Sequence, residues 1–162
     1  MDLKVINAPN DAVRLRKIRL RALQDAPYAF GAELKVESEK SIEYWQNYLD
    51  GSDWCIAVSN SEDVGVLAVD LADADRGSDC WLSSWWIAES FRGQGIPKLM
   101  LEWLDKLCQS KGWKKQGLGV WPENERAIAA YLKLGFIKGE NPLQSRSRPE
   151  KMYLPMYRNL PL

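Results

Sequence analysis

The residues best suited to chemistry form a short glycine loop, Arg92-Gly93-Gln94-Gly95-Ile96-Pro97, which Lys98 follows. The loop joins a strand-like run at residues 80–88, CWLSSWWIA, to a stretch with helical spacing. Closely spaced glycines allow a sharp turn that gathers backbone N–H groups where the helix dipole is positive. The segment therefore predicts a site for an anion such as a phosphate, although a plain strand-to-helix turn explains this segment alone equally well.

Two other phosphate motifs do not fit this loop. A dinucleotide fingerprint that begins at Gly93 needs a small residue where Lys98 stands, and a Walker loop needs Gly-Lys-Ser/Thr, which the sequence lacks. The sequence also contains no histidine, which excludes Ser-His-Asp and Cys-His catalysis. Without histidine or paired cysteines we expect no metal site. The chemistry must rely on carboxylates, Tyr, Lys, backbone amides or a cofactor.

The elements around the loop follow an α/β order. Helical spacing predicts helices at residues 11–23 and 41–49, a helix that starts at Pro97, and one from the N-cap Asn124 to Gly135. Apolar and β-branched runs predict strands at residues 54–58, 64–71, 80–88, 116–121, near 136 and at 152–157, with an irregular loop at 142–149. Because no repeat or linker divides the chain, we expect one domain over residues 1–162.

Two segments resemble the GNAT superfamily of N-acetyltransferases. Residues 87–101 are similar to its acetyl-CoA motif, Arg/Gln-x-x-Gly-x-Gly/Ala after the fourth strand. The positions that fall on this motif are Arg92, Gly95 and residue 97. The family's second segment is matched at the same offsets by Asn124, Ala127, Tyr131 and Leu134-Gly135-Phe136. Two motifs in the correct order are more specific than either one, and the likeness extends over nearly the whole chain.

The resemblance implies a fold and a cofactor. The fold is a GNAT-like mixed, mostly antiparallel sheet of about six to seven strands flanked by helices, in which the fourth and fifth strands splay apart around pantetheine. The co-substrate is acetyl-CoA. Its expected contacts are Ile87, Arg92, Gly93, Gln94, Gly95, Ile96, Pro97, Lys98, Asn124 and Tyr131. Backbone groups near Ile87 would contact pantetheine and the oxyanion, and the loop would hold the pyrophosphate.

The resemblance also assigns a general acid. The hydroxyl of Tyr131 would protonate the departing thiolate, although its spacing with Ile128 and Leu132 also fits a core tyrosine. Asn124 would contact pantetheine and cap its own helix, and these two roles are compatible.

Pro97 departs from the family pattern, which usually has Gly or Ala at this position. Proline suits the first helical position because its missing N–H breaks no intrahelical bond, but it cannot donate to a phosphate oxygen. A hydrogen bond to a charged group is worth roughly 1.5–3 kcal/mol, so its loss predicts CoA binding weakened about ten-fold or more but not abolished.

The general base and the acceptor stay open. Asp79, Glu33 and Glu37 are carboxylates that would accept the amine proton, and we name Asp79; an amine of low pKa would need no strong base. The acceptor is an amine on a small molecule or a peptide, and Trp85 and Trp86 suggest a pocket for it.

Three classes of function follow. The first is an N-acetyltransferase in which the amine attacks acetyl-CoA directly in a ternary complex. The second is a CoA-binding sensor or regulatory module without catalysis, which the proline at position 97 motivates. The third is nucleic-acid binding through the basic residues 14–21, which we disfavour because 22 basic and 22 acidic residues balance over the chain.

The composition also bears on location. The N-terminus shows no leader pattern, and no apolar run reaches the ~18 residues of a membrane span. Cys55, Cys80 and Cys108 are odd in number and lie far apart, which favours free thiols in a reducing compartment. We therefore expect a cytoplasmic protein with no nucleic-acid or membrane partner; a homodimer stays open.

Overall fold

The computed structural model describes residues 1–161. These residues form two compact units: the first comprises Met1–Asp70 and Ser84–Leu101, and the second comprises Leu71–Ser83 and the chain from Glu102 onward. Each unit is described by itself below. The expectation of one domain over residues 1–162 stays a prediction.

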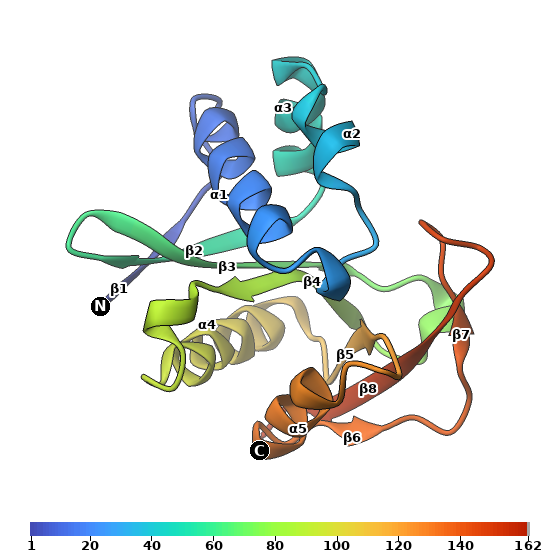
Figure 1. The fold of residues 1–162 in the computed structure, drawn as a ribbon. Coiled ribbons are helices and arrows are strands. Elements are labelled where there is room, and N and C mark those ends of the chain that lie inside the picture. The colour runs from blue at the N-terminus through green and yellow to red at the C-terminus, as the bar shows by residue number, and fades with distance from the viewer. Residues whose placement is uncertain (162) are drawn as a thin grey trace. The chain divides into compact units, whose positions relative to one another are not determined.

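Helices and strands are mixed along the chain (Figure 1). In chain order they are β1 (Asp2–Val5), α1 (Asp11–Asp25), α2 (Leu34–Ser38), α3 (Ile42–Asp50), β2 (Asp53–Ser59), β3 (Glu62–Leu71), β4 (Cys80–Ile87), α4 (Ile96–Lys111), β5 (Lys115–Val120), α5 (Glu125–Lys133), β6 (Ile137–Lys138), β7 (Leu143–Gln144) and β8 (Met152–Asn159). Short 3-10 turns lie at Pro27–Ala29, Ala74–Arg76 and Glu89–Phe91.

The strands form one sheet in the order β1-β2-β3-β4-β5-β8-β6, and β7 pairs with β8. β5 pairs antiparallel with β8 and parallel with β4, where Cys80–Leu82 lie opposite Gln116–Leu118. This arrangement confirms the predicted mixed, mostly antiparallel α/β fold, with eight strands in place of six to seven. The predicted splay concerns strand ends that belong to different units, and it stays a prediction.

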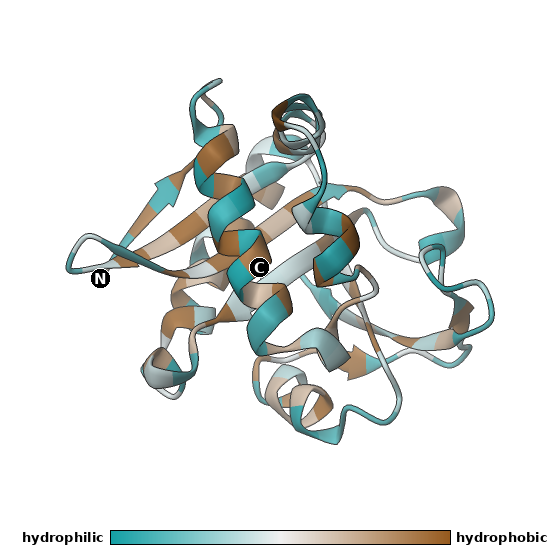
Figure 2. Ribbon diagram, turned by 45° about the horizontal axis from the view of Figure 1, so that its top comes forward, coloured by the Kyte–Doolittle hydropathy of each residue, from teal (hydrophilic) through white to brown (hydrophobic). Residues whose placement is uncertain are grey.

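The first unit is built on the β2–β3 hairpin. Its turn holds Asn60 and Ser61 at positive φ, and nearly every residue from Trp54 to Ala57 and from Val64 to Val69 is buried. Helices α1 and α3 lie side by side (Figure 1) and bury apolar residues from one face each, while hydrophilic residues occupy their other faces (Figure 2). Ser41 caps α3 by accepting a hydrogen bond from the Tyr44 amide at 3.2 Å.

The second unit is centred on β5 and β8. Two glycines of β5 leave room for aromatic rings: a Cβ at Gly117 would lie 2.8 Å from the Trp81 ring, and one at Gly119 would lie 2.7 Å from the Tyr153 ring. Helix α5 ends in a Schellman motif, because the Phe136 amide donates to the Tyr131 carbonyl at 3.0 Å and the Gly135 amide to the Leu132 carbonyl at 3.1 Å.

Several predicted boundaries need correction. Helix α4 begins at Ile96, so Pro97 is its second residue rather than its first. The predicted irregular loop at residues 142–149 contains the short strand β7. Strand β1 and helix α2 were not predicted, because β1 is largely exposed and α2 has only 5 residues, too few to show a helical period.

Candidate functional site

The glycine loop has the backbone geometry of an anion site. Gly93 and Gly95 have φ of 76° and 82°, and an added Cβ at either residue would meet nothing within 4 Å. Glycine is therefore needed there for its left-handed conformation and not for space. The first helical bond runs from the Leu99 amide to the Gly95 carbonyl at 3.1 Å, so the N–H groups of Ile96 and Lys98 have no acceptor within the helix.

Arg92 is held by groups of its own unit. Its Nη2 donates to Asp25 Oδ2 at 2.7 Å, and its Nε donates to the Ile87 carbonyl at 3.0 Å. The same carboxylate oxygen accepts the indole N–H of Trp86 at 2.8 Å. The charge of Arg92 is thus compensated by Asp25, and the exposed Lys98 is the remaining basic side chain of the predicted loop. The Ile87 carbonyl, predicted to contact pantetheine, already accepts a hydrogen bond.

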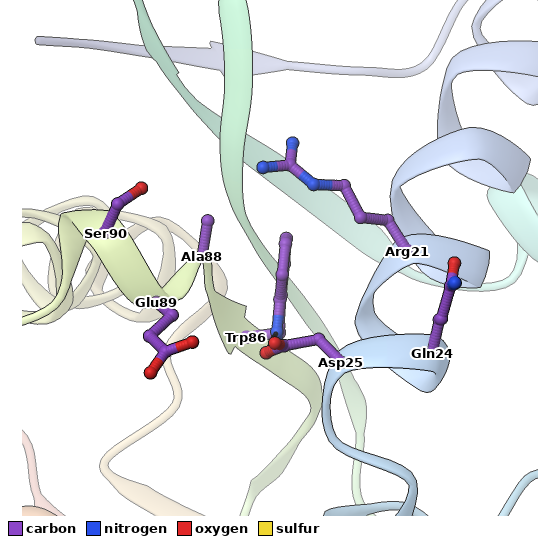
Figure 3. Close-up of a pocket in the computed structure, with 7 residues that line it drawn as sticks. All are labelled: Arg21, Gln24, Asp25, Trp86, Ala88, Glu89 and Ser90. Carbon is purple, nitrogen blue, oxygen red and sulfur yellow. Dashed lines mark hydrogen bonds between the residues drawn. The ribbon is translucent and has the colours of Figure 1, made fainter.

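A pocket of about 630 Å³ opens beside the loop (Figure 3). Its lining residues are Arg21, Gln24, Asp25, Trp86, Ala88, Glu89 and Ser90. Figure 3 shows the Trp86 ring between α1, which carries Asp25, and the segment of Glu89 and Ser90. The Arg21 guanidinium lies over the Trp86 ring, 5.2 Å from its centroid. Trp86 thus lines a pocket as expected, and the prediction that this pocket holds the acceptor stays a prediction.

Strand β4 contains a strained residue that sequence reasoning missed. Ser84 has φ of +53° in the middle of the strand, is only 6% exposed, and its hydroxyl has no hydrogen-bond partner within residues 1–161. The Ala72 amide donates to the Asp79 carbonyl, and the Ala88 amide donates to the Val64 carbonyl. Between these two hydrogen bonds the chain advances nine residues from Asp79 to Ala88 but only eight from Val64 to Ala72. The extra residue is a β-bulge. Such strain in a buried strand is typical of functional segments.

Asn124 and Tyr131 both belong to α5 and its cap. The Asn124 side chain accepts from the Ala127 amide at 3.3 Å, which confirms its predicted role as N-cap. Asn124 precedes α5, and Tyr131 lies within it, seven residues further along the chain. Burial raises the pKa of the Tyr131 phenol to about 12, so the hydroxyl keeps its proton at neutral pH.

Asp79 has a structural role that weighs against proton transfer. Its Oδ2 accepts the amides of Lys114 at 2.7 Å and Lys115 at 2.9 Å, and thereby holds the start of β5. These two backbone hydrogen bonds lower the pKa of the Asp79 carboxyl below its usual value. A carboxylate stabilised in this way is a weaker proton acceptor, and the base role of Asp79 stays a prediction.

Of the other two candidate bases, Glu37 has the more suitable environment. One oxygen, Oε1, accepts the Tyr44 hydroxyl at 3.3 Å. The other, Oε2, is buried and has no partner in the part of the chain that the structure describes. Glu33 is exposed at the start of α2.

The predicted site residues thus divide between the units. Ile87 and the loop Arg92–Lys98 belong to the first unit, together with the pocket and Glu37; Asp79, Asn124 and Tyr131 belong to the second. Over residues 1–161, no helix has the length and apolar character needed to cross a membrane.

Known proteins share both the sequence pattern and the fold. The model of the Acetyltransferase (GNAT) family matches residues 17–136. The uncharacterized N-acetyltransferase YdgE of Bacillus subtilis (strain 168) is 29% identical over 109 residues, which cover 63% of this chain and 69% of that protein.

Solved structures resemble the fold over almost the full length. A GNAT-family acetyltransferase from Streptococcus pneumoniae superposes with a TM-score of 0.71 at 21% identity, covering 99% of this chain and 100% of that one. The PaiA N-acetyltransferase from Thermoplasma acidophilum, in complex with coenzyme A, gives 0.70 at 17% identity, covering 98% and 99%. With the family match over residues 17–136 and the sheet topology, these findings place the chain in the Acetyltransferase (GNAT) family.

Proposed function

We propose that the chain is an N-acetyltransferase that transfers the acetyl group of acetyl-CoA directly to an amine in a ternary complex. The observation that carries this proposal is the loop Gly93–Lys98, in which two left-handed glycines lead into the start of α4. The coenzyme A in the complex of the related T. acidophilum protein supports the choice of cofactor.

The loop supplies the cofactor contacts. The N–H groups of Ile96 and Lys98, the helix dipole and the Lys98 ammonium would attract the pyrophosphate. Arg92 contributes rigidity instead of free charge, because it ties the loop to Asp25 of α1 and to the end of β4.

The reaction forms one bond and breaks another. The neutral amine nitrogen attacks the thioester carbonyl carbon, the C–S bond breaks, a base takes a proton from nitrogen, and Tyr131 gives a proton to sulfur. The raised pKa of Tyr131 supports the acid role because it keeps the hydroxyl protonated over the working pH range. Asn124, at the start of the same helix, would orient the pantetheine arm.

Glu37 is our choice of base, and a paired experiment tests it. We expect Glu37→Gln to lower kcat/KM for amine acetylation by about 100-fold, and Asp79→Asn to change it by less than about two-fold. Initial rates of free-thiol release give both values. The opposite order of effects would restore Asp79 as the base and remove Glu37.

Asp79→Asn has its own expected effect on stability. Because the pKa of Asp79 is lower in the folded than in the unfolded chain, its contribution is present above the unfolded-state pKa and disappears as the pH falls through the folded-state pKa. The variant should therefore unfold at lower urea concentration than the parent at pH 7, and the two midpoints should converge in acid. A constant difference at all pH values would contradict this linkage.

Pro97→Gly should strengthen CoA binding. Glycine at the second position of α4 restores an N–H that has no acceptor within the helix, so we expect the Kd for CoA to fall by about ten-fold. Isothermal titration calorimetry measures the change. Pro97→Ala restores the same N–H with a better helix former and should give a similar gain; unchanged affinity in both variants would mean that this amide does not face the pyrophosphate.

A CoA-binding sensor without catalysis is the second candidate. It is favoured by two observations at the loop: Pro97 offers no N–H, and Asp25 compensates Arg92. A screen of primary amines with acetyl-CoA separates the two functions. An enzyme releases CoA thiol with at least one amine above the background hydrolysis, whereas a sensor binds CoA and releases none.

A further inference from the structure

Arg19 differs from the other arginines of α1. Arg14 and Arg21 contact the start of β3: Arg14 pairs with Asp63 at 2.6 Å, and Arg21 with Glu62 at 3.1 Å. Arg19 is only 5% exposed, and neither its Nε nor its Nη1 has a hydrogen-bond partner within residues 1–161. Its guanidinium lies over the Phe30 ring, 4.9 Å from the centroid.

A buried guanidinium whose N–H groups lack acceptors lowers the stability of the folded chain. The cation–π contact with Phe30 compensates part of the charge, but it leaves the N–H donors unsatisfied. Buried donors in native proteins are nearly always paired, and those that are not require an explanation such as a missing ligand. A carboxylate is the group that accepts hydrogen bonds from a guanidinium most strongly.

An anionic group is buried in the same region. Glu37 Oε2 is buried and unpartnered, while Oε1 accepts the hydroxyl of Tyr44. Burial, together with the nearby Glu37, raises the pKa of Tyr44 to about 12, and the charge of Arg19 opposes this shift. The side chains of Arg19 on α1 and Glu37 on α2 thus both lie near the Tyr44 hydroxyl.

We propose that Arg19 and Glu37 bind the acceptor as an amino carboxylate, with its carboxylate on the Arg19 guanidinium and its amine on Glu37. The inference rests on the proposed acetyl transfer, because it names the substrate class of that reaction. It is consistent with Glu37 as base, since the carboxylate that holds the amine is also the one that takes its proton. The Phe30 ring would cover one face of the Arg19 guanidinium and exclude water from the ion pair.

Matched pairs of acceptors test the carboxylate contact. The pairs are phenylalanine with phenethylamine, and lysine with cadaverine, which differ only in the carboxylate. We expect the parent protein to favour the amino acid of at least one pair in kcat/KM by about ten-fold to 100-fold. Arg19→Met should reduce this preference to a kcat/KM ratio near one. Arg19→Lys keeps a positive charge and should retain part of the preference.

Lys17→Met is the matched control, because Lys17 lies on the same helix and is exposed. Lys17→Met should leave kcat/KM for both acceptors of each pair unchanged. Urea unfolding of Arg19→Met and Arg19→Lys verifies that the variants are folded under assay conditions. A parent protein with equal kcat/KM for both members of every pair would overturn the proposal, as would an Arg19→Met variant that slows both members equally while Arg19→Lys slows neither.

Calorimetric titration with the same amino acids, without acetyl-CoA, separates this inference from the proposed function. Binding heat that Arg19→Met removes and Lys17→Met retains supports the amino-carboxylate site even if no amine is acetylated, in which case only the transfer reaction fails. Acetylation of plain amines without binding of any tested amino acid has the reverse meaning: the transferase stands and the assignment of Arg19 is withdrawn.

Discussion

Replacing Tyr131 with phenylalanine is expected to lower kcat for amine acetylation by about 100-fold or more, because a positioned general acid contributes about 10²–10⁴ to the rate. The thiolate would then leave without a proton donor. The substitution removes a single oxygen atom and keeps the ring. This ring packs edge-on against Phe136, with 6.0 Å between the ring centroids, so the fold should persist. The Kd for CoA, measured by calorimetry, should change by less than about two-fold.

The pH dependence gives a second view of Tyr131. With its pKa raised to about 12, the tyrosine does not lose its proton in the range where acetylation is assayed, so the alkaline limb of the rate profile should not reflect its ionisation. Tyr28→Phe is the control because Tyr28 is 65% exposed. If both variants retained the parent rate, Tyr131 would be only a packing residue of α5.

Replacing Asp105 with leucine is expected to produce the largest loss of stability, about 3 kcal/mol. Asp105 on α4 receives two hydrogen bonds from the Arg158 guanidinium, at 2.7 Å and 3.1 Å, and one from Gln116 at 2.7 Å. The side chains of Arg158 and Asp105 are 14% and 21% exposed. Removing the carboxylate leaves a largely buried guanidinium with the Gln116 carbonyl, at 2.9 Å, as the acceptor that remains of this network.

Urea unfolding at pH 7 measures this loss, and two further variants interpret it. Asp105→Leu combined with Arg158→Met removes both charges, so it should be more stable than Asp105→Leu alone. Glu62→Gln removes one partner of the exposed pair with Arg21 and should change stability little. If the double variant were no more stable than the single one, the loss would come from packing and not from an unpaired charge.

The parts of the site that follow from local sequence were predictable. Glycines before a helix predict the loop, Asn124 predicts a cap, and the Leu134-Gly135-Phe136 ending corresponds to the Schellman motif that closes α5. The position of Pro97 was off by one residue, because the choice between Ile96 and Pro97 as the first helical residue depends on the backbone of Gly95.

The parts that depend on distant contacts were not predictable. Arg92 lies 67 positions from its partner Asp25, and no local pattern links the two residues. The strain at Ser84 has no signal in an apolar strand that contains two consecutive serines. In the sequence Arg19 is one of the basic residues 14–21, and its burial became visible only with the segment that carries Phe30. Long-range packing, not propensity, decides these three cases.

The double use of Asp25 has a thermodynamic consequence. Its carboxylate lines the pocket beside Trp86, and it also neutralises Arg92 at the glycine loop. A cationic molecule in the pocket that pairs with Asp25 competes with Arg92 and leaves its guanidinium free to face an anion at the loop. By linkage, an anion on the loop that attracts Arg92 makes Asp25 a better partner for that cation by the same factor. Two such ligands would therefore bind cooperatively through one carboxylate oxygen.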